Sequence, residues 1–162
     1  MGTRCAVIGA GAWGTTIAQC LADNDHEVVL WCYKDAIANA INESHSHHRL
    51  PGVSLNPAIQ AVSELSHCYD ADYVVLGLSS SQLLLMDTRI DWSQIKGPVG
   101  IIAKGLIQPD LFISDWLHLR VNQPVFVISG PNLALEIANR KIAATVVAST
   151  NPSVAQSVQS LL

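Results

Sequence analysis

Charged residues are scarce in this sequence, and basic residues in particular never cluster. Lysine and arginine together number 9, and aspartate and glutamate 13, among 162 residues, which gives a formal net charge of −4. A protein that binds along a nucleic acid neutralises many phosphates and needs a basic run or patch to do so. Because the chain has no such run, we expect no nucleic-acid partner.

Long apolar stretches are also lacking, although the overall composition is apolar. A membrane-spanning helix needs about 18 uninterrupted apolar residues, and a secretory signal needs an apolar region that the first residues do not contain. Hydrophobic residues nevertheless make up 49% of the chain and charged residues only 14%. This balance suits a sheet covered on both faces, or a domain that lacks its partner. We expect a cytoplasmic protein with no membrane span.

Residues that bind metals in proteins are few and poorly spaced. The four cysteines are scattered along the first half of the chain: Cys5, Cys20, Cys32 and Cys68. Without a C-x-x-C pair they indicate neither a zinc site nor a disulfide framework, and reduced thiols are the simplest interpretation. His45, His47 and His48 crowd together, but only Glu43 accompanies them as a further ligand. We therefore expect solvated histidines in a loop and no metal.

The sequence does contain a regular alternation of short apolar runs with segments of helical period. The apolar runs, each a predicted strand, are residues 4–9, 27–32, 59–62, 73–78, 99–103, 125–129 and 143–148, of which 59–62 is the weakest. The helical period is found at residues 12–22, 34–43, 80–87, 110–120 and 152–162. This alternation predicts an α/β fold: a doubly wound, Rossmann-like, mostly parallel sheet with helices on both faces.

The length and the end of the chain bear on its domain organisation. A chain of 162 residues suits one domain, which usually has about 100–200 residues, and we take residues 1–162 as a single domain. Its last residues lie inside a predicted helix that has no cap or polar tail. We therefore expect the chain to be part of a longer protein.

A glycine-rich turn separates the first predicted strand from the first predicted helix. Residues 9–14 read G-A-G-A-W-G and match the pattern G-x-G-x-x-G. In that pattern Gly9 permits a tight turn, Gly11 lets the backbone approach a pyrophosphate, and Gly14 allows close packing of helix on strand. Free N–H groups and the positive helix end then favour an anion. The alternatives are a turn that binds nothing or binds another nucleotide, and Trp13 either packs inside or covers the pyrophosphate.

The second predicted strand lacks the acidic residue that would bind the ribose 2′-hydroxyl of NAD. It ends in Trp31-Cys32-Tyr33-Lys34, and Asp35 comes late. No carboxylate then repels a 2′-phosphate, and Lys34 and the Tyr33 hydroxyl can contact one. We predict that NADPH binds at least as well as NADH. The alternative is a solvated Lys34 at the start of a helix.

Two later loops follow predicted strands and carry polar groups. Lys104 follows residues 99–103, and Gly130 and Asn132 follow residues 125–129. Ligands of open α/β sheets bind beyond the carboxyl ends of the strands, so a cation and an amide there are placed to meet substrate or cofactor. A solvated loop charge and a plain strand-to-helix turn are the alternatives.

Five motifs therefore follow one another along the chain. They are G-x-G-x-W-G, Leu30-Trp31, Leu50-Pro51-Gly52, Lys104-Gly105 and Ser129-Gly130-Pro131-x-x-Ala134-x-Glu136. In this order they resemble the N-terminal domain of bacterial NAD(P)-dependent glycerol-3-phosphate dehydrogenase, over essentially all 162 residues.

The resemblance implies a set of contacts with a cofactor, NADP or NAD, and with a substrate. Besides the glycines of the turn, the cofactor contacts fall at Ala12, Trp13, Tyr33, Lys34, Lys104 and Ala134. The substrate contacts fall at Lys104, Gly130 and Asn132. Lys104 is thus implied to touch both molecules.

The resemblance also implies a reaction, the interconversion of sn-glycerol 3-phosphate and dihydroxyacetone phosphate by hydride transfer, which feeds glycerophospholipid synthesis. In the family, the proton-donor lysine and the arginine and asparagine that hold the substrate phosphate belong to a helical C-terminal domain absent from this chain. We therefore expect the chain to bind cofactor without turnover. A homodimer of the full-length protein is a further expectation.

The sequence departs from the family pattern in four places. Ala12 replaces a common serine, Ser79-Ser80 a Pro-Ser pair, and Asn132-Leu133 the usual Ser/Thr-Phe, while residues 46–49 read S-H-H-R where Asn-x-x-Tyr or Asn-x-x-Phe is usual. Alternatives are the first domain of a hydroxyacyl-CoA dehydrogenase or a ketopantoate reductase, and a non-catalytic nucleotide-binding module. The joint presence of L-P-G and S-G-P argues against the first two.

Overall fold

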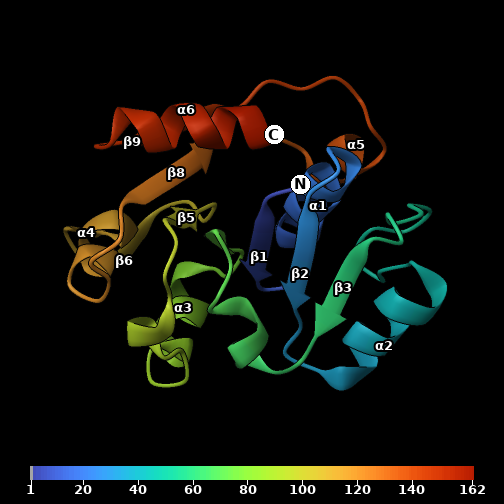
Figure 1. The fold of residues 1–162 in the computed structure, drawn as a ribbon, viewed down its shortest axis with the longest axis horizontal. Helices are drawn as coiled ribbons and strands as arrows, with labels where there is room; N and C mark the ends of the chain where they lie inside the picture. Colours follow the sequence, from blue (N-terminus) through green and yellow to red (C-terminus); the bar gives the residue numbers. More distant parts are fainter. Residues whose placement is uncertain (1) are drawn as a thin grey trace.

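The computed structural model describes residues 2–162, and its centre is one large sheet (Figure 1). The sheet has seven strands in the order β3-β2-β1-β4-β5-β8-β9. Its strands are β1 (Arg4–Ile8), β2 (Glu27–Trp31), β3 (Ile59–Val62), β4 (Tyr73–Leu76), β5 (Val99–Ile101), β8 (Val125–Ser129) and β9 (Val146–Ser149). All neighbours pair in parallel except β9, which runs antiparallel to β8. The predicted Rossmann-like, mostly parallel sheet is confirmed.

Helices connect the strands. They are α1 (Ala12–Asp23), α2 (Asp35–Ser44), α3 (Ser80–Met86), α4 (Ile113–His118), α5 (Ala134–Ala138) and α6 (Pro152–Leu161), with short 3-10 turns η1 (Leu65–Cys68) and η2 (Trp92–Gln94). None of the helices in residues 2–162 combines the length and apolar character that crossing a bilayer requires.

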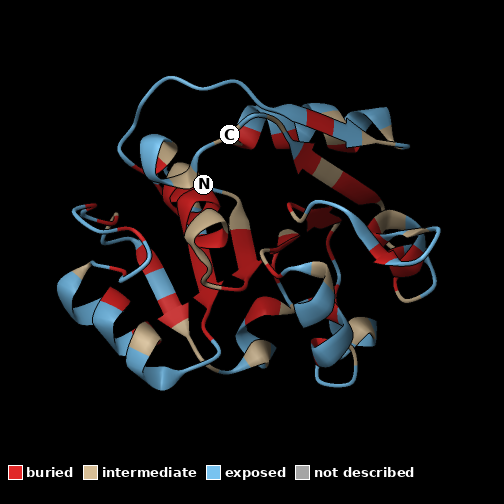
Figure 2. Cartoon of the chain, turned by 180° about the vertical axis from the view of Figure 1, so that it is seen from behind, coloured by how far each residue is buried: buried red, intermediate tan, exposed pale blue. Residues whose placement is uncertain are grey.

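Alternating residues of the central strand β1 show that both faces of the sheet are buried. Cys5 and Val7 belong to one apolar cluster, with Leu21 of α1 and Val158 of α6. Their neighbours Ala6 and Ile8 belong to a second cluster, which also holds residues of α3 and α4. Because successive side chains of a strand point to opposite faces, helices cover the sheet on both sides. Figure 2 shows the resulting buried strands between largely exposed outer helix surfaces.

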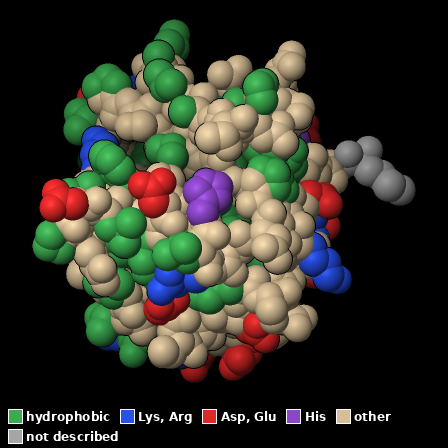
Figure 3. All heavy atoms as spheres, turned by 90° about the vertical axis from the view of Figure 1, so that its left-hand side faces the viewer, with side chains coloured by type: hydrophobic (Ala, Val, Ile, Leu, Met, Phe, Trp, Pro, Cys, Tyr) green, Lys and Arg blue, Asp and Glu red, His purple; other side chains and the backbone are tan. Residues whose placement is uncertain are grey.

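The exposed surface still carries several large apolar side chains. Leu106, Phe112 and Leu119 are among the exposed ones near α4. The side of the molecule that bears α4 shows apolar side chains scattered among polar and charged ones (Figure 3). Burial on both faces of the sheet thus accounts for much of the apolar composition, and a missing partner domain stays a prediction.

The predicted helix at residues 110–120 is wrong at its start. Leu106–Gln108 and Leu111–Phe112 form an antiparallel hairpin, β6 and β7, and α4 begins only at Ile113. Asp110 has a φ of 60°, in the left-handed region, which reverses the chain direction and cannot continue a helix. The hairpin therefore replaces the first helical turn.

The predicted strand at residues 143–148 is shifted, and its direction has a consequence for function. The strand starts at Val146 and pairs with β8 in the antiparallel sense. An antiparallel return needs no crossover to the other end of the sheet. The segment between the two strands, residues 130–145, therefore begins and ends beside the carboxyl end of β8. The short helix α5 within it packs against α1.

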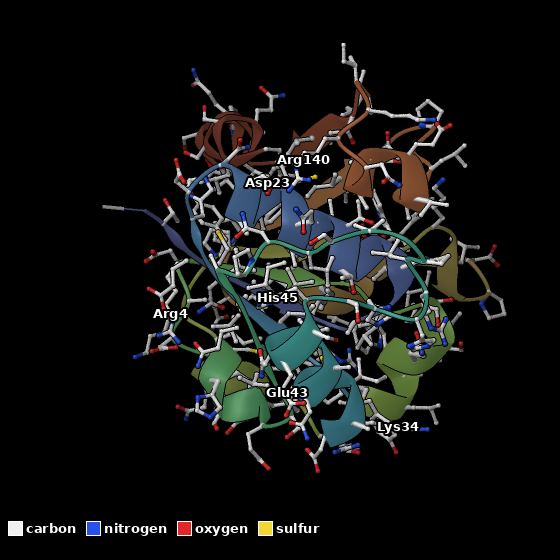
Figure 4. All side chains as sticks on the ribbon, turned by 90° about the vertical axis from the view of Figure 1, so that its right-hand side faces the viewer. Arg4, Asp23, Lys34, Glu43, His45 and Arg140 are labelled. Atoms are coloured by element: carbon white, nitrogen blue, oxygen red, sulfur yellow. The ribbon has the colours of Figure 1, made fainter. Side chains whose placement is uncertain are left out.

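An ion pair fixes the segment after α5 to α1. Asp23, at the end of α1, pairs with the Arg140 guanidinium at 2.9 Å, as Figure 4 illustrates, and also accepts a hydrogen bond from Asn56 at 2.9 Å. The Thr16 hydroxyl of α1 donates to the Ala134 carbonyl at 3.1 Å. These contacts hold the start of α5, and with it the loop at residue 132, at a fixed place beside α1.

Candidate functional site

The glycine turn after β1 is packed so tightly that two of its glycines are required by the fold. Gly9 has a φ of 120°, and a Cβ there would lie 2.8 Å from the Gly77 carbonyl oxygen. A Cβ on Gly14 would collide with the Gly9 carbonyl oxygen. Gly77, at the end of β4, meets the same turn, since its own Cβ would lie 2.7 Å from the Gly9 oxygen. The sequence analysis missed Gly77 because no motif marks it.

Gly11 differs from its neighbours because protein packing does not require it. Its φ is −75°, and the nearest atom to a Cβ would be the Gly77 carbonyl oxygen at 3.8 Å, an ordinary contact. Gly11 is also the N-cap of α1, which has no side-chain cap hydrogen bond and no acidic residue in its first turn. The first amides of this helix are therefore available to an anion. A turn that is open at Gly11 and closed at Gly14 fits a pyrophosphate.

A cavity of about 450 Å³ lies at the carboxyl edge of the sheet, beside this turn. It brings together residues 11–14, Lys104, Gly130 and Asn132, all of which were predicted as site residues. Ser79 and Ser80, at the start of α3, also line it. Lys104 is the one charged residue of the lining. The predicted site residues that are far apart in sequence thus meet at one place.

Asn132 is oriented by its neighbours and keeps one acceptor free. Its Nδ2 donates to the Thr145 hydroxyl at 3.1 Å, and that hydroxyl donates to the Ser129 carbonyl at 2.9 Å. Its Oδ1 is buried and has no hydrogen-bond partner among the described residues. Buried polar atoms are nearly always hydrogen bonded, so this oxygen is an acceptor left without a protein partner in a residue that lines the cavity.

A second cavity, of about 410 Å³, lies on the other side of the turn. Its lining includes Tyr33, Lys34, His48 and Arg49, and it shares Gly11, Gly77 and Leu78 with the first cavity. Tyr33 is 66% exposed and packs edge-on to Trp31, with 6.2 Å between ring centroids. The two cavities therefore adjoin at the glycine turn, an arrangement suited to an elongated ligand.

The histidine loop is only partly what the sequence suggests. His47 is buried, its ring stacks on His48 with centroids 4.6 Å apart, and its Nδ1 accepts a hydrogen bond from the Arg49 amide at 3.1 Å. Burial lowers the pKa of His47, as does the neighbouring His48, while the Ala10 carbonyl opposes the shift. The expectation of solvated histidines is thus wrong for His47, which packs under the glycine turn. Within residues 2–162, no three His, Cys, Asp or Glu side chains gather as a metal site.

Two further predicted contacts have different outcomes. Trp13 is partly buried against the apolar cluster beneath α1 and also lines the first cavity. The packing interpretation of Trp13 is therefore confirmed, and its contact with a pyrophosphate stays a prediction. Ala134 begins α5 and packs against α1, and it is not part of either cavity lining. Its contact with a cofactor stays a prediction.

The cysteines are unsuited to nucleophilic chemistry. All four are free thiols, and Cys5, Cys32 and Cys68 are fully buried. Burial is the main cause that raises the pKa of each of these three thiols to about 12. Since the thiolate is the reactive form, these side chains act as core residues.

The parallel sheet, the glycine turn between β1 and α1, and the paired cavities at the carboxyl edge define the class of Rossmann-type dinucleotide-binding domains. Within this class, the family described as the N-terminus of NAD-dependent glycerol-3-phosphate dehydrogenase matches residues 4–155. The chain belongs to this family. The resemblance drawn from the ordered motifs is thereby confirmed.

Individual relatives agree with the family match. The chain is 36% identical over 167 residues to a glycerol-3-phosphate dehydrogenase [NAD(P)+] of Corynebacterium diphtheriae, covering 98% of this chain and 50% of the relative. It is 34% identical over 170 residues to the enzyme of that name from Thermobifida fusca, with 98% and 50% covered. The chain thus spans about half the length of these curated relatives.

A solved structure shares the fold. The crystal structure of glycerol-3-phosphate dehydrogenase from Coxiella burnetii superimposes with a TM-score of 0.85 and 24% sequence identity, covering 99% of this chain and 51% of that one. At this identity the comparison supports the architecture, and the assignment to the family depends on the sequence match.

Proposed function

We propose that this chain binds NAD or NADP and is the cofactor-binding half of an enzyme that interconverts sn-glycerol 3-phosphate and dihydroxyacetone phosphate, feeding glycerophospholipid synthesis. The observation that carries the proposal is the open space at Gly11. A Cβ there would contact only the Gly77 carbonyl oxygen, at an ordinary distance of 3.8 Å. The uncapped start of α1 faces the same space. When bound, the cofactor supplies the hydride chemistry.

The chain's own residues would position both molecules and stabilise charge. The amides at the start of α1 would receive the pyrophosphate. As the ketone of the substrate is reduced, negative charge builds on its oxygen, and the Lys104 ammonium in the same cavity would stabilise it. The free Asn132 Oδ1 would accept a hydrogen bond from a substrate hydroxyl.

The first cavity holds only part of what the reaction needs. Lys104 is its one cation, whereas a substrate phosphate is usually bound by several charge-assisted hydrogen bonds. The chain also covers only about half of its relatives. We propose that a helical C-terminal domain supplies the proton-donor lysine and the groups that hold the phosphate. On this account the chain alone binds cofactor and does not turn over, and a homodimer of the longer protein stays a prediction.

We further propose that the protein works in the cytoplasm. All four of its cysteines are free thiols, and reduced thiols are the normal state in that compartment.

Calorimetric titration of the 162-residue chain with NADH and with NADPH tests this function. We expect saturable binding with one site per chain, and no oxidation of NADH when dihydroxyacetone phosphate is added. Absence of binding to both cofactors would overturn the proposal. Steady turnover by this chain alone would overturn the proposal that a second domain supplies the proton donor and the phosphate-binding groups.

A further inference from the structure

The basic side chains of the molecule are distributed unevenly. Four of the nine pair with carboxylates: Arg4, Arg120, Arg140 and Lys141. The remaining five form no such pair within residues 2–162: Lys34, Arg49, Arg89, Lys96 and Lys104. The chain has more carboxylates than basic side chains, with a net charge of −4. Places where basic side chains gather without carboxylate partners are therefore candidates for anion binding.

Three of these five cations meet around Tyr33. Lys34 and Arg49 line the second cavity together with Tyr33. Arg89, which follows α3, places its guanidinium carbon 5.3 Å from the centroid of the Tyr33 ring, within the range of a cation–π contact. No carboxylate lines this cavity, and Asp35, next to Lys34, is exposed at the first position of α2. The far end of the cleft is therefore positively charged.

The backbone at Arg49 is firmly held although its side chain is exposed. The Arg49 amide donates to the buried His47 ring at 3.1 Å, and the amide of buried Leu50 donates to the His47 carbonyl at 2.9 Å. A guanidinium on such a support loses less conformational entropy when it binds an anion.

We propose that Arg49, together with Lys34, binds the 2′-phosphate of NADPH, and that Arg89, held against Tyr33, strengthens this site, so that the chain selects NADP over NAD. This inference rests on the proposed function. A guanidinium binds a phosphate dianion through paired charge-assisted hydrogen bonds, and a 2′-hydroxyl offers no such charge. The glycine turn separates this cavity from the one with Lys104, so selection of the cofactor and positioning of the substrate use different cations.

The test measures affinities of the 162-residue chain for NADPH, NADH, 2′,5′-ADP and inorganic phosphate by calorimetry. For wild type we expect NADPH to bind about tenfold or more tighter than NADH, the effect of one charge-assisted contact. Arg49→Ala should lose about tenfold for NADPH and 2′,5′-ADP and keep its affinity for NADH. Arg89→Ala should lose about threefold for the same two ligands. Arg49→Tyr, which keeps a large side chain and removes the charge, should remove the preference for NADPH.

Lys96→Ala is the matched control, since Lys96 is an unpaired cation outside both cavity linings. It should leave all four affinities unchanged. Equal affinities of wild type for NADPH and NADH, an equal loss of both in Arg49→Ala, or inorganic phosphate binding as tightly as 2′,5′-ADP would each overturn the inference and leave the proposed function standing. Failure of both NADPH and NADH to bind wild type would instead overturn the proposed function.

Discussion

The two cavities that meet at the glycine turn differ in how complete they are. The cavity near Tyr33 combines Lys34, Arg49 and a tyrosine ring that contacts Arg89, all supplied by this chain. The cavity at the carboxyl ends of β5 and β8 has a single cation, Lys104, and an amide with an unused acceptor. One end is thus equipped to recognise a ligand, whereas the other offers only some of the groups that a reaction requires.

On the proposed function, cofactor recognition and catalysis should therefore be separable. Binding at the Tyr33 end and at the turn should need nothing beyond residues 2–162. Chemistry at the Lys104 end should need the proposed second domain. Substitutions that affect one end and spare the other therefore test this division.

The largest effect is expected for Lys104→Met in the proposed longer protein. Loss of a cation that stabilises a developing oxyanion typically lowers turnover by about 10²–10³-fold. The affinity of the 162-residue chain for NADPH should change by less than the turnover does, since the turn and the Tyr33 end are intact. Steady-state kinetics and calorimetry provide the two readouts. A variant whose turnover is unchanged would remove Lys104 from the mechanism.

The next largest effect is expected for Gly11→Ala, which fills the space shared by both cavities. The methyl group would meet only the Gly77 oxygen at 3.8 Å, so the melting temperature should stay within a few degrees of wild type. Affinity for NADH and NADPH should fall alike, by about 10–100-fold, the equivalent of one lost charge-assisted hydrogen bond. Calorimetry and thermal unfolding check the two halves of this prediction.

Gly14→Ala provides the contrast to Gly11→Ala. Its methyl group would collide with the Gly9 carbonyl, so this variant should unfold at a clearly lower temperature. Equal melting temperatures for the two variants would contradict the distinction between a glycine required by packing and one that leaves room for a ligand.

A smaller effect, on stability, is expected from pH through His47. Because burial lowers its pKa in the folded state, the unfolded chain takes up a proton at a higher pH than the folded chain does. The free energy of unfolding is therefore highest above the unfolded pKa of His47, about 6.5. It decreases as pH falls from that value toward the lower folded pKa, by about 1.4 kcal/mol per pH unit. Chemical denaturation between pH 8 and about pH 5 should show this slope in wild type, and a shallower one in His47→Gln. Parallel slopes would rule out His47 as the cause.

The smallest effect is expected far from the cleft, for Arg120→Met. The Arg120 Nε donates to Asp87 Oδ1 at 2.6 Å, and this hydrogen bond is the main cause that lowers the pKa of the Asp87 carboxyl. The pair is partly exposed, so its loss should cost about 1 kcal/mol. The stability that this pair gives is present above the ordinary pKa of aspartate, 3.8, and is lost as pH falls through the lower folded pKa, so the difference between wild type and variant should shrink in acid. Cofactor affinity should not change.

Some features of the site follow from sequence because local motifs determine them. The glycine turn, Lys104 and Asn132 each lie directly after an apolar run, and the carboxyl ends of parallel strands share one edge of a sheet. That rule alone predicts that they meet, and they line one cavity. The alternation of strands and helices likewise predicts the sheet, though not the antiparallel direction of β9.

Other features depend on neighbours that only the folded chain provides. Gly77 is required by the approach of Gly9 and Gly14, more than 60 residues earlier in the chain. The burial of His47 under the turn and the contact of Arg89 with Tyr33 likewise join separate loops. The hairpin at residues 106–112 depends on one left-handed residue, Asp110, in a stretch whose apolar spacing also suits a helix. Spacing in a single sequence carries none of these long-range constraints.

The most direct measurement of the central claim is the amide spectrum of the ¹⁵N-labelled chain during titration with NADPH. If the start of α1 holds the pyrophosphate, the amides of residues 11–14 should show the largest shifts, with smaller shifts around Tyr33 and Lys104 at the two ends of the cleft. Saturable binding that leaves the amides of residues 11–14 unshifted would contradict the account.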